Sequence, residues 1–131
     1  MAPEPRIWRN TVRENGSLFH RARITDRDGN VSVQGDFTGL ATIQVYDVSG
    51  ADADTVVFSN VTNVSSILTN TLQLPWPDGD GIGWNLEVEV TSNQVAREGG
   101  HTYRTEVTMT HTVEGDNTTV FENLAKGLRR A

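Results

Sequence analysis

The 131-residue chain contains no cysteine, which excludes disulfide bridges, thiolate metal sites and a cysteine nucleophile. It also lacks any apolar run of the roughly 18 residues that a membrane-spanning helix needs. Its first residues, MAPEPRIWRN, lack the apolar segment of a secretory signal. Acidic residues (17) outnumber Lys and Arg (11), and the net charge of −6 argues against general binding to a nucleic-acid backbone. We therefore expect neither a membrane nor a nucleic acid as a partner.

The apolar content of the chain, 36%, is sufficient for one buried core and too high for a disordered chain. The length fits a single domain. Because no disulfide stabilises it, such a domain depends on its own core or on contacts with partner subunits.

Alternation of apolar and polar residues with a period of two dominates the sequence and predicts β-strands with one buried face. It is clearest in WNLEVEV (84–90), where Asn85, Glu87 and Glu89 are expected to face outward. HTYRTEVTMTHTV (101–113) alternates in the same way, with threonines and charged residues outward. The residues expected to face inward in these and four shorter runs are Leu18, His20, Ala22, Ile24, Ala41, Ile43, Val45, Val56, Phe58, Leu68, Leu72, Leu74, Trp84, Leu86, Val88, Val90, His101, Tyr103, Thr105, Val107, Met109, His111 and Val113.

Turn-forming sequences separate these runs, among them NG at 15–16, DGN at 28–30 and PDGDG at 77–81. About seven or eight short strands joined by such turns predict a single antiparallel β-sandwich. The expected fold class is therefore all-β.

The two ends of the chain are expected to differ from its middle. Residues 1–15, which contain two prolines and paired charges, are typical of an N-terminal arm that precedes a sandwich over residues 16–131. For residues 118–131 two alternatives stay open. The helical spacing of apolar residues after Thr119 favours a short terminal helix, whereas the sequence TTVF and Gly127 favour a closing strand.

Two acidic loops suggest calcium binding, but turns explain both of them better. The first is PWPDGDGIGW (75–84). In DGDGIGWNLEVE (78–89), which overlaps it, Asp78, Asp80, Gly83 and Glu89 partly imitate the spacing of an EF-hand. However, an isoleucine stands where an oxygen ligand belongs, and a strand follows where the motif requires a helix. TDRDGN (25–30) fits a type I′ hairpin turn centred on Asp28-Gly29 without any ion.

The three histidines form no metal-binding pattern. His101 and His111 lie about 33 Å apart along an extended strand, so they cannot share an ion. His20 is expected to be a packed imidazole in the core. We therefore expect no metal and no cofactor.

Catalytic patterns are equally weak, and we expect no catalytic residues and no enzymatic activity. No serine lies in a G-x-S-x-G elbow. A pair of carboxylates drawn from Glu87, Glu89 and Glu106 would suit a glycosidase, but their expected outward position favours a solvated sheet face.

Aromatic residues supply the interface candidates. Trp76 lies between two prolines and is expected to be exposed, which suits a protein interface or a platform for stacking a sugar. In the arm, the candidates are Ile7, Trp8 and Arg9. For these residues, docking on a neighbouring subunit and packing on the chain's own domain both stay open.

Two motifs of the chain stand out together. The first is the D-x-D-G hairpin of Asp26, Asp28 and Gly29, followed by an extended strand. The second is the G-x-x-Y-x-x-E strand that contains Gly100, Tyr103 and Glu106 and leads through a Gly-containing turn to a closing segment. With these motifs, residues 18–125 resemble the small Ig-like domains of tailed-bacteriophage structural proteins, best known from the N-terminal domain of baseplate upper proteins.

The resemblance implies an Ig-like β-sandwich that acts as a non-enzymatic virion structural protein assembled in the host cytoplasm. Its partners would be the major capsid protein, which it would decorate as a cement protein, or subunits of the neck, tail or baseplate. We expect a homo-oligomer. The alternative from another class is a carbohydrate-binding β-sandwich module with Trp76 as its platform.

Overall fold

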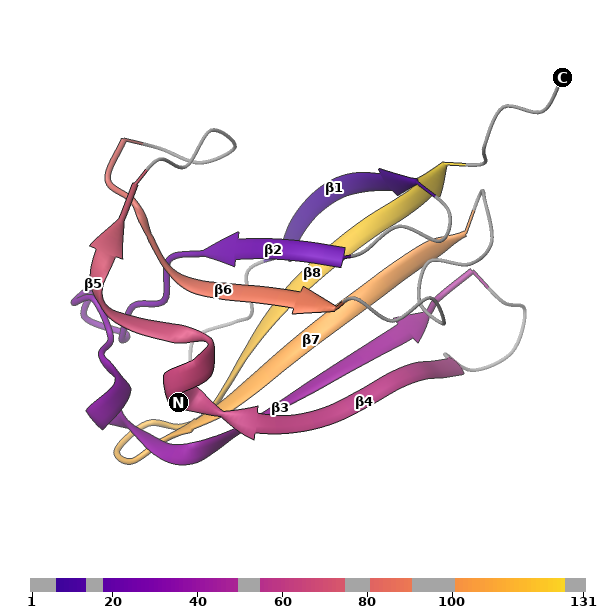
Figure 1. The fold of residues 1–131 in the computed structure, drawn as a ribbon. Coiled ribbons are helices and arrows are strands. Elements are labelled where there is room, and N and C mark those ends of the chain that lie inside the picture. The colour runs from indigo at the N-terminus through magenta and orange to yellow at the C-terminus, as the bar shows by residue number, and fades with distance from the viewer. Residues whose placement is uncertain (1–6, 14–17, 50–54, 75–80, 91–100, 127–131) are drawn as a thin grey trace, which may run out of the picture.

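A computed structural model describes residues 7–13, 18–49, 55–74, 81–90 and 101–126 of the chain (Figure 1). Two β-sheets form two layers, and the predicted all-β sandwich is confirmed. The strands are β1 (Ile7–Arg13), β2 (Leu18–Ala22), β3 (Phe37–Asp47), β4 (Thr55–Asn63), β5 (Leu68–Gln73), β6 (Trp84–Val90), β7 (Thr102–His111) and β8 (Gly115–Lys126). Two single-turn 3-10 helices, η1 (Gln34–Asp36) and η2 (Val64–Ser66), flank β3 and β5. Neither of these helical turns is long enough to cross a membrane, and the described residues contain no other helix that could do so.

The strand order is β1-β8-β7-β3-β4 in the larger sheet and β2-β6-β5 in the smaller one. All pairs between strands are antiparallel except β1 with β8. The long β7–β8 hairpin runs from Thr102 opposite Leu124 to His111 opposite Gly115. The C-terminal alternative is therefore settled in favour of a strand as far as Lys126, because β8 pairs with β7 up to Leu124 and with β1 up to Lys126.

The expected separation of an N-terminal arm needs a correction over residues 7–13. These residues form β1, which pairs in parallel with β8 from Ile7 opposite Val120 to Arg13 opposite Lys126. The prolines that indicated an arm precede the strand, whereas IWRNTVR is rich in β-branched and aromatic residues. A parallel neighbour distant in sequence leaves no local pattern, so the pairing could not be anticipated.

The core lies between the two sheets and contains most of the residues that were expected to face inward. All predicted inward positions of β2 and of the centre of β3 are buried, and on β7 Tyr103, Thr105, Val107 and Met109 are buried too. Three expectations were wrong at strand ends: Val56 (49% exposed), Leu74 (61%) and Val113 (78%) lie on the surface. A register shift between Val45 and Tyr46 changes the face of Val56, and Val113 lies beyond the end of β7.

The start of β6 also departs from strict alternation. Asn85, expected outside, is fully buried, whereas Trp84, expected in the core, is only half-buried. The Asn85 side chain accepts a hydrogen bond from the Ile24 amide (2.6 Å) and donates to the carbonyls of Ile24 and Ser32 (3.0 Å each). These backbone groups require a polar partner inside the protein, so the side-chain amide of Asn85 turns inward and Trp84 turns toward the surface.

Candidate functional site

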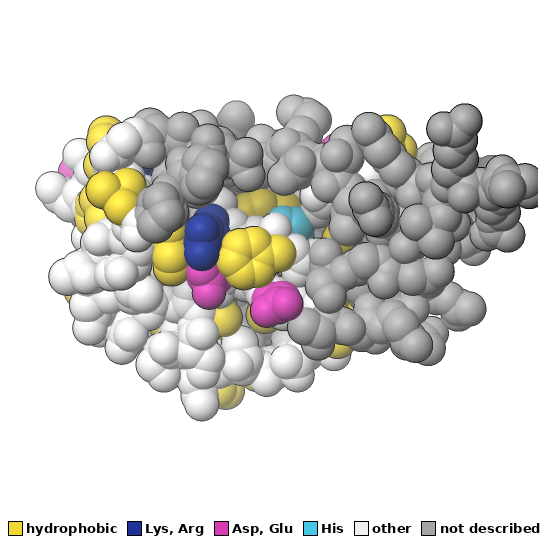
Figure 2. Space-filling model, turned by 45° about the horizontal axis from the view of Figure 1, so that its top comes forward, with side chains coloured by type: hydrophobic (Ala, Val, Ile, Leu, Met, Phe, Trp, Pro, Cys, Tyr) yellow, Lys and Arg dark blue, Asp and Glu magenta, His cyan; other side chains and the backbone are white. Residues whose placement is uncertain are grey.

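The outer face of the three-stranded sheet carries a cluster of aromatic and charged side chains, which we call the β2–β6 surface: Phe19, Arg21, Trp84, Glu87 and Glu89. Figure 2 shows hydrophobic, basic and acidic side chains adjoining on one face of the molecule. Phe19 and Arg21 are two residues apart on β2, so both point away from the core. Residues of β6 lie directly opposite them, with Phe19 across from Glu89 and Arg21 across from Glu87.

Arg21 is the centre of this cluster. Its guanidinium carbon lies 5.0 Å from the ring centroid of Phe19 and 4.5 Å from that of Trp84, within the range of cation–π attraction. Its Nε donates a hydrogen bond of 2.9 Å to Oε2 of Glu87. The side chains of Arg21 and Glu87 are 28% and 38% exposed, so solvent screens the ion pair and its contribution to stability is small.

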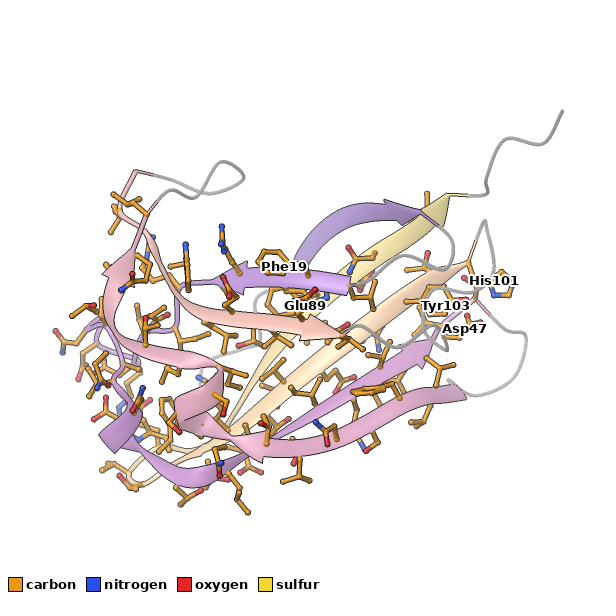
Figure 3. The ribbon with its side chains drawn as sticks, viewed as in Figure 1. Phe19, Asp47, Glu89, His101 and Tyr103 are labelled. Carbon is orange, nitrogen blue, oxygen red and sulfur yellow. The ribbon has the colours of Figure 1, made fainter. Side chains whose placement is uncertain are left out.

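The exposed members of the cluster are the two residues beside this ion pair, Phe19 and Glu89. Phe19 is 46% exposed and Glu89 is also exposed. Figure 3 shows both side chains, Phe19 on β2 and Glu89 on β6. Aromatic side chains and arginine supply most of the binding energy in protein interfaces. The cluster therefore combines the residue types that are common in protein interfaces, and its Arg21 is held by Phe19, Trp84 and Glu87.

A second polar group closes one end of the larger sheet (Figure 3). His101 Nδ1 lies 2.7 Å from Oδ2 of Asp47, and the His101 ring stacks near Tyr103 with a centroid distance of 6.5 Å. The other carboxylate oxygen of Asp47 accepts a hydrogen bond from the Ser49 amide (3.0 Å), and Ser49 Oγ accepts one from the Thr102 amide (2.6 Å). These contacts join the end of β3 to the start of β7, which is a structural role.

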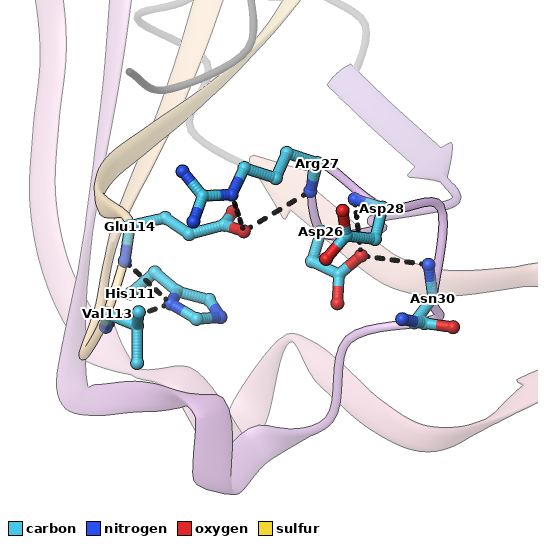
Figure 4. A network of polar contacts seen from close by, with 7 residues as sticks. All are labelled: Asp26, Arg27, Asp28, Asn30, His111, Val113 and Glu114. Atoms are coloured by element: carbon cyan, nitrogen blue, oxygen red, sulfur yellow. Dashed lines mark hydrogen bonds and ion pairs between the residues drawn. The ribbon is translucent and has the colours of Figure 1, made fainter.

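The acidic loop at residues 25–30 is a turn, as expected, but of another type (Figure 4). The Gly29 amide donates to the Asp26 carbonyl (3.0 Å), so the turn is centred on Arg27-Asp28, and Gly29 follows with φ +86°. This is the arrangement of a type I turn with a left-handed glycine. Asp26 Oδ1 accepts hydrogen bonds from the amides of Asp28 and Asn30, 2.9 Å each. The hydrogen bond from the Asn30 amide is the main cause that lowers the pKa of Asp26.

A neighbouring turn holds the first one in place. Arg27 Nε lies 3.6 Å from the carboxylate of Glu114 in the β7–β8 turn, and the Arg27 amide donates to the same oxygen (3.3 Å). His111 Nδ1 accepts hydrogen bonds from the amides of Val113 and Glu114. Across the described segments, no three histidine or acidic side chains come together in a group that could hold a metal ion.

The structure also tests two further expectations, the burial of His20 and the grouping of the three candidate carboxylates. His20 is buried, as predicted, and the burial lowers its pKa from 6.5 to about 4. The three candidate carboxylates do not come together. Glu87 and Glu89 lie on β6 of the smaller sheet, whereas Glu106 lies on the outer side of β7, between the inward-facing Thr105 and Val107 of the larger sheet.

The predicted interface residues are placed only in part. Ile7, Trp8 and Arg9 lie on β1, opposite Val120, Phe121 and Glu122 of β8, and their contact role stays a prediction. Trp76 falls outside the described residues.

The β2–β6 surface was not predicted from the sequence. Its signal was Phe19, an apolar residue at a position of β2 that alternation assigns to solvent.

Comparison of the chain with protein-family models, with curated proteins and with solved structures found no match.

Proposed function

We propose that the chain is a non-enzymatic structural subunit of a tailed-bacteriophage virion. It would dock on the capsid as a decoration protein, or on the neck, tail or baseplate, after assembly in the host cytoplasm. The sequence resemblance to phage Ig-like domains motivates this role, and the β-sandwich is compatible with it. The observation that carries the proposal is the β2–β6 surface, because its composition is that of a protein interface.

The geometry of Arg21 favours a protein partner. The guanidinium is fixed between two rings and one carboxylate, so little side-chain entropy is lost when a partner covers it. Phe19, 46% exposed, supplies apolar area beside the Arg21 guanidinium.

The histidines of the described residues support a non-catalytic role. His20 is buried between the sheets, His101 is bound to Asp47, and His111 accepts hydrogen bonds from two turn amides. Each imidazole therefore has a structural function where it lies.

The test is incorporation into virions of the phage that encodes the chain. We expect mass spectrometry of purified particles to detect the chain in many copies, and Phe19→Ala with Arg21→Ala to reduce that amount at least tenfold. Val113→Ala, at an exposed position in the β7–β8 turn, is the matched control and should be incorporated normally. Particles that contain no copy of the wild-type chain would refute the proposal.

A carbohydrate-binding module is the second candidate, favoured by one observation. The exposed ring of Phe19 lies opposite the exposed carboxylate of Glu89, and an aromatic platform beside a hydrogen-bond acceptor suits a sugar. Against it, the Arg21 guanidinium lies over both aromatic rings of the surface and competes for the faces on which a sugar would stack. Binding on a glycan array that is lost in Phe19→Ala and kept in Val113→Ala would support this second role.

A further inference from the structure

The strand β4 forms one edge of the larger sheet, and its own sequence lacks the charges and prolines that usually protect an edge. Among the described strands it pairs only with β3. Its sequence, TVVFSNVTN, contains no charged residue, no proline and no glycine over 9 residues. Natural sheets protect edges of this length with charges, prolines or a covering segment, because unpaired backbone groups recruit another strand.

The other edge strands differ from β4. β1 carries Arg9 and Arg13, and β2 carries Arg21. The edge of β5 is partly covered, because Gln34 of η1 donates from its side chain to the Leu68 carbonyl (2.7 Å) and from its amide to Asn70 (2.8 Å). β4 is thus the long neutral edge of the described structure.

Apolar side chains on and beside β4 are exposed as well. Val56 and Val61 are 49% and 57% exposed, and Leu40, which lies opposite Asn63 on β3, is 59% exposed. The register shift opposite Tyr46 interrupts only the first part of the strand, and pairing is continuous from Phe58 to Asn63. A regularly paired stretch with one exposed apolar side chain, Val61, and with the exposed Leu40 beside it therefore remains available for pairing.

We infer that β4 pairs in antiparallel orientation with β4 of a second copy of this chain, which joins the two larger sheets across a two-fold axis. This inference rests on the proposed function and deepens it, because it names the surface through which copies of the structural subunit associate. The backbone edge specifies a β-strand as the occupant. A two-fold axis makes the same strand meet itself, which is the commonest form of self-assembly.

The distribution of charge selects a second copy over another partner. The chain carries a net charge of −6, so two copies repel each other over much of their surface. All of β4 and residues 40–46 of β3 (LATIQVY) are uncharged. Two copies that meet here oppose no like charges, whereas a charged partner strand would find no opposite charge on this edge.

The test is the solution mass of the full chain, measured by light scattering over a wide range of concentration. We expect the mass of two chains for the wild type and of one chain for Val56→Lys with Val61→Lys. The matched control is Leu74→Lys with Val113→Lys, which places the same two charges at positions 61% and 78% exposed away from β4 and should remain a dimer. A wild type that is monomeric at every concentration, or a β4 variant that still dimerises, would overturn the inference.

A second measurement does not depend on the folding of any variant. In hydrogen exchange of the wild type, the outward amides of β4 should become protected as the concentration rises, whereas those of the β5 edge should not change. Protection of β4 that is independent of concentration would contradict self-pairing. Because the variants leave the β2–β6 surface intact, loss of the dimer with retained incorporation into virions would separate this inference from the proposed function.

Discussion

His20 and Phe121 stack with ring centroids 4.3 Å apart and ring planes inclined by 13°, which joins β2 of the smaller sheet to β8 of the larger one. The imidazole Nε2 lies 3.2 Å from the Thr105 hydroxyl and 3.4 Å from the side-chain nitrogen Nδ2 of Asn123. Because the Asn123 nitrogen can only donate, Nε2 accepts and the proton of the neutral ring lies on Nδ1. The contact between the sheets thus depends on a neutral imidazole.

This arrangement predicts a loss of stability in mild acid. Burial lowers the pKa of His20 from 6.5 in the unfolded chain to about 4, so the folded protein resists protonation. The contribution of neutral His20 to the free energy of unfolding is fully present above pH 6.5. It is lost as the pH falls through that value toward 4, by about 3 kcal/mol in total. Urea unfolding at a series of pH values measures it. His20→Asn should remove this part of the slope, and equal slopes for the two proteins would contradict the prediction.

Replacing Asn85 with alanine should destabilise the protein strongly. The change leaves the Ile24 amide and the carbonyls of Ile24 and Ser32 without a partner in a buried place. We expect a loss of about 3 kcal/mol in the free energy of unfolding. Asn70→Ala is the control, because Asn70 is exposed and accepts a single hydrogen bond from the Gln34 amide. The idea fails if the two variants unfold at the same denaturant concentration.

Replacing Gly83 with alanine should also be costly. Gly83 has φ +118°, and a Cβ atom there would lie 2.7 Å from the backbone oxygen of Gln73. Both the backbone strain and the collision oppose the substitution, and we expect a loss of about 2 kcal/mol. Gly35→Ala, where a Cβ meets nothing within 4 Å, should change the melting temperature little. A Gly83→Ala protein as stable as the wild type would show that the corner before β6 has another shape.

The Asp26 turn predicts a graded response to substitution. Asp26→Asn keeps an oxygen that can accept from the amides of Asp28 and Asn30, whereas Asp26→Ala removes it. Thermal unfolding near neutral pH should therefore rank the wild type above the asparagine variant and the alanine variant last. Since the pKa of Asp26 is lowered, its contribution is present above the ordinary pKa of an aspartate and is lost as the pH falls through the lowered value. If the alanine variant equals the asparagine variant, the turn does not depend on these hydrogen bonds.

The β2–β6 surface shows which contacts cannot be predicted from the sequence. Alternation placed Arg21 outside, which is correct, but the approach of its guanidinium to Phe19 and Trp84 depends on the β2–β6 register and on the inward turn of Asn85. Both depend on contacts between residues more than fifty positions apart. No local pattern contains them.

The sequence by itself determined that this protein is an all-β sandwich, because a period of two is a property of each strand alone. It determined in the same way that His20 and Val107 lie in the core and that 25–30 is a turn. Only the tertiary structure decided that Ile7–Arg13 joins the larger sheet, that Trp84 faces outward beside Arg21, and that β4 forms an uncharged edge. Strand order and register are set by backbone pairing between distant segments, and such pairing depends on the competition among all strands rather than on the residues of one.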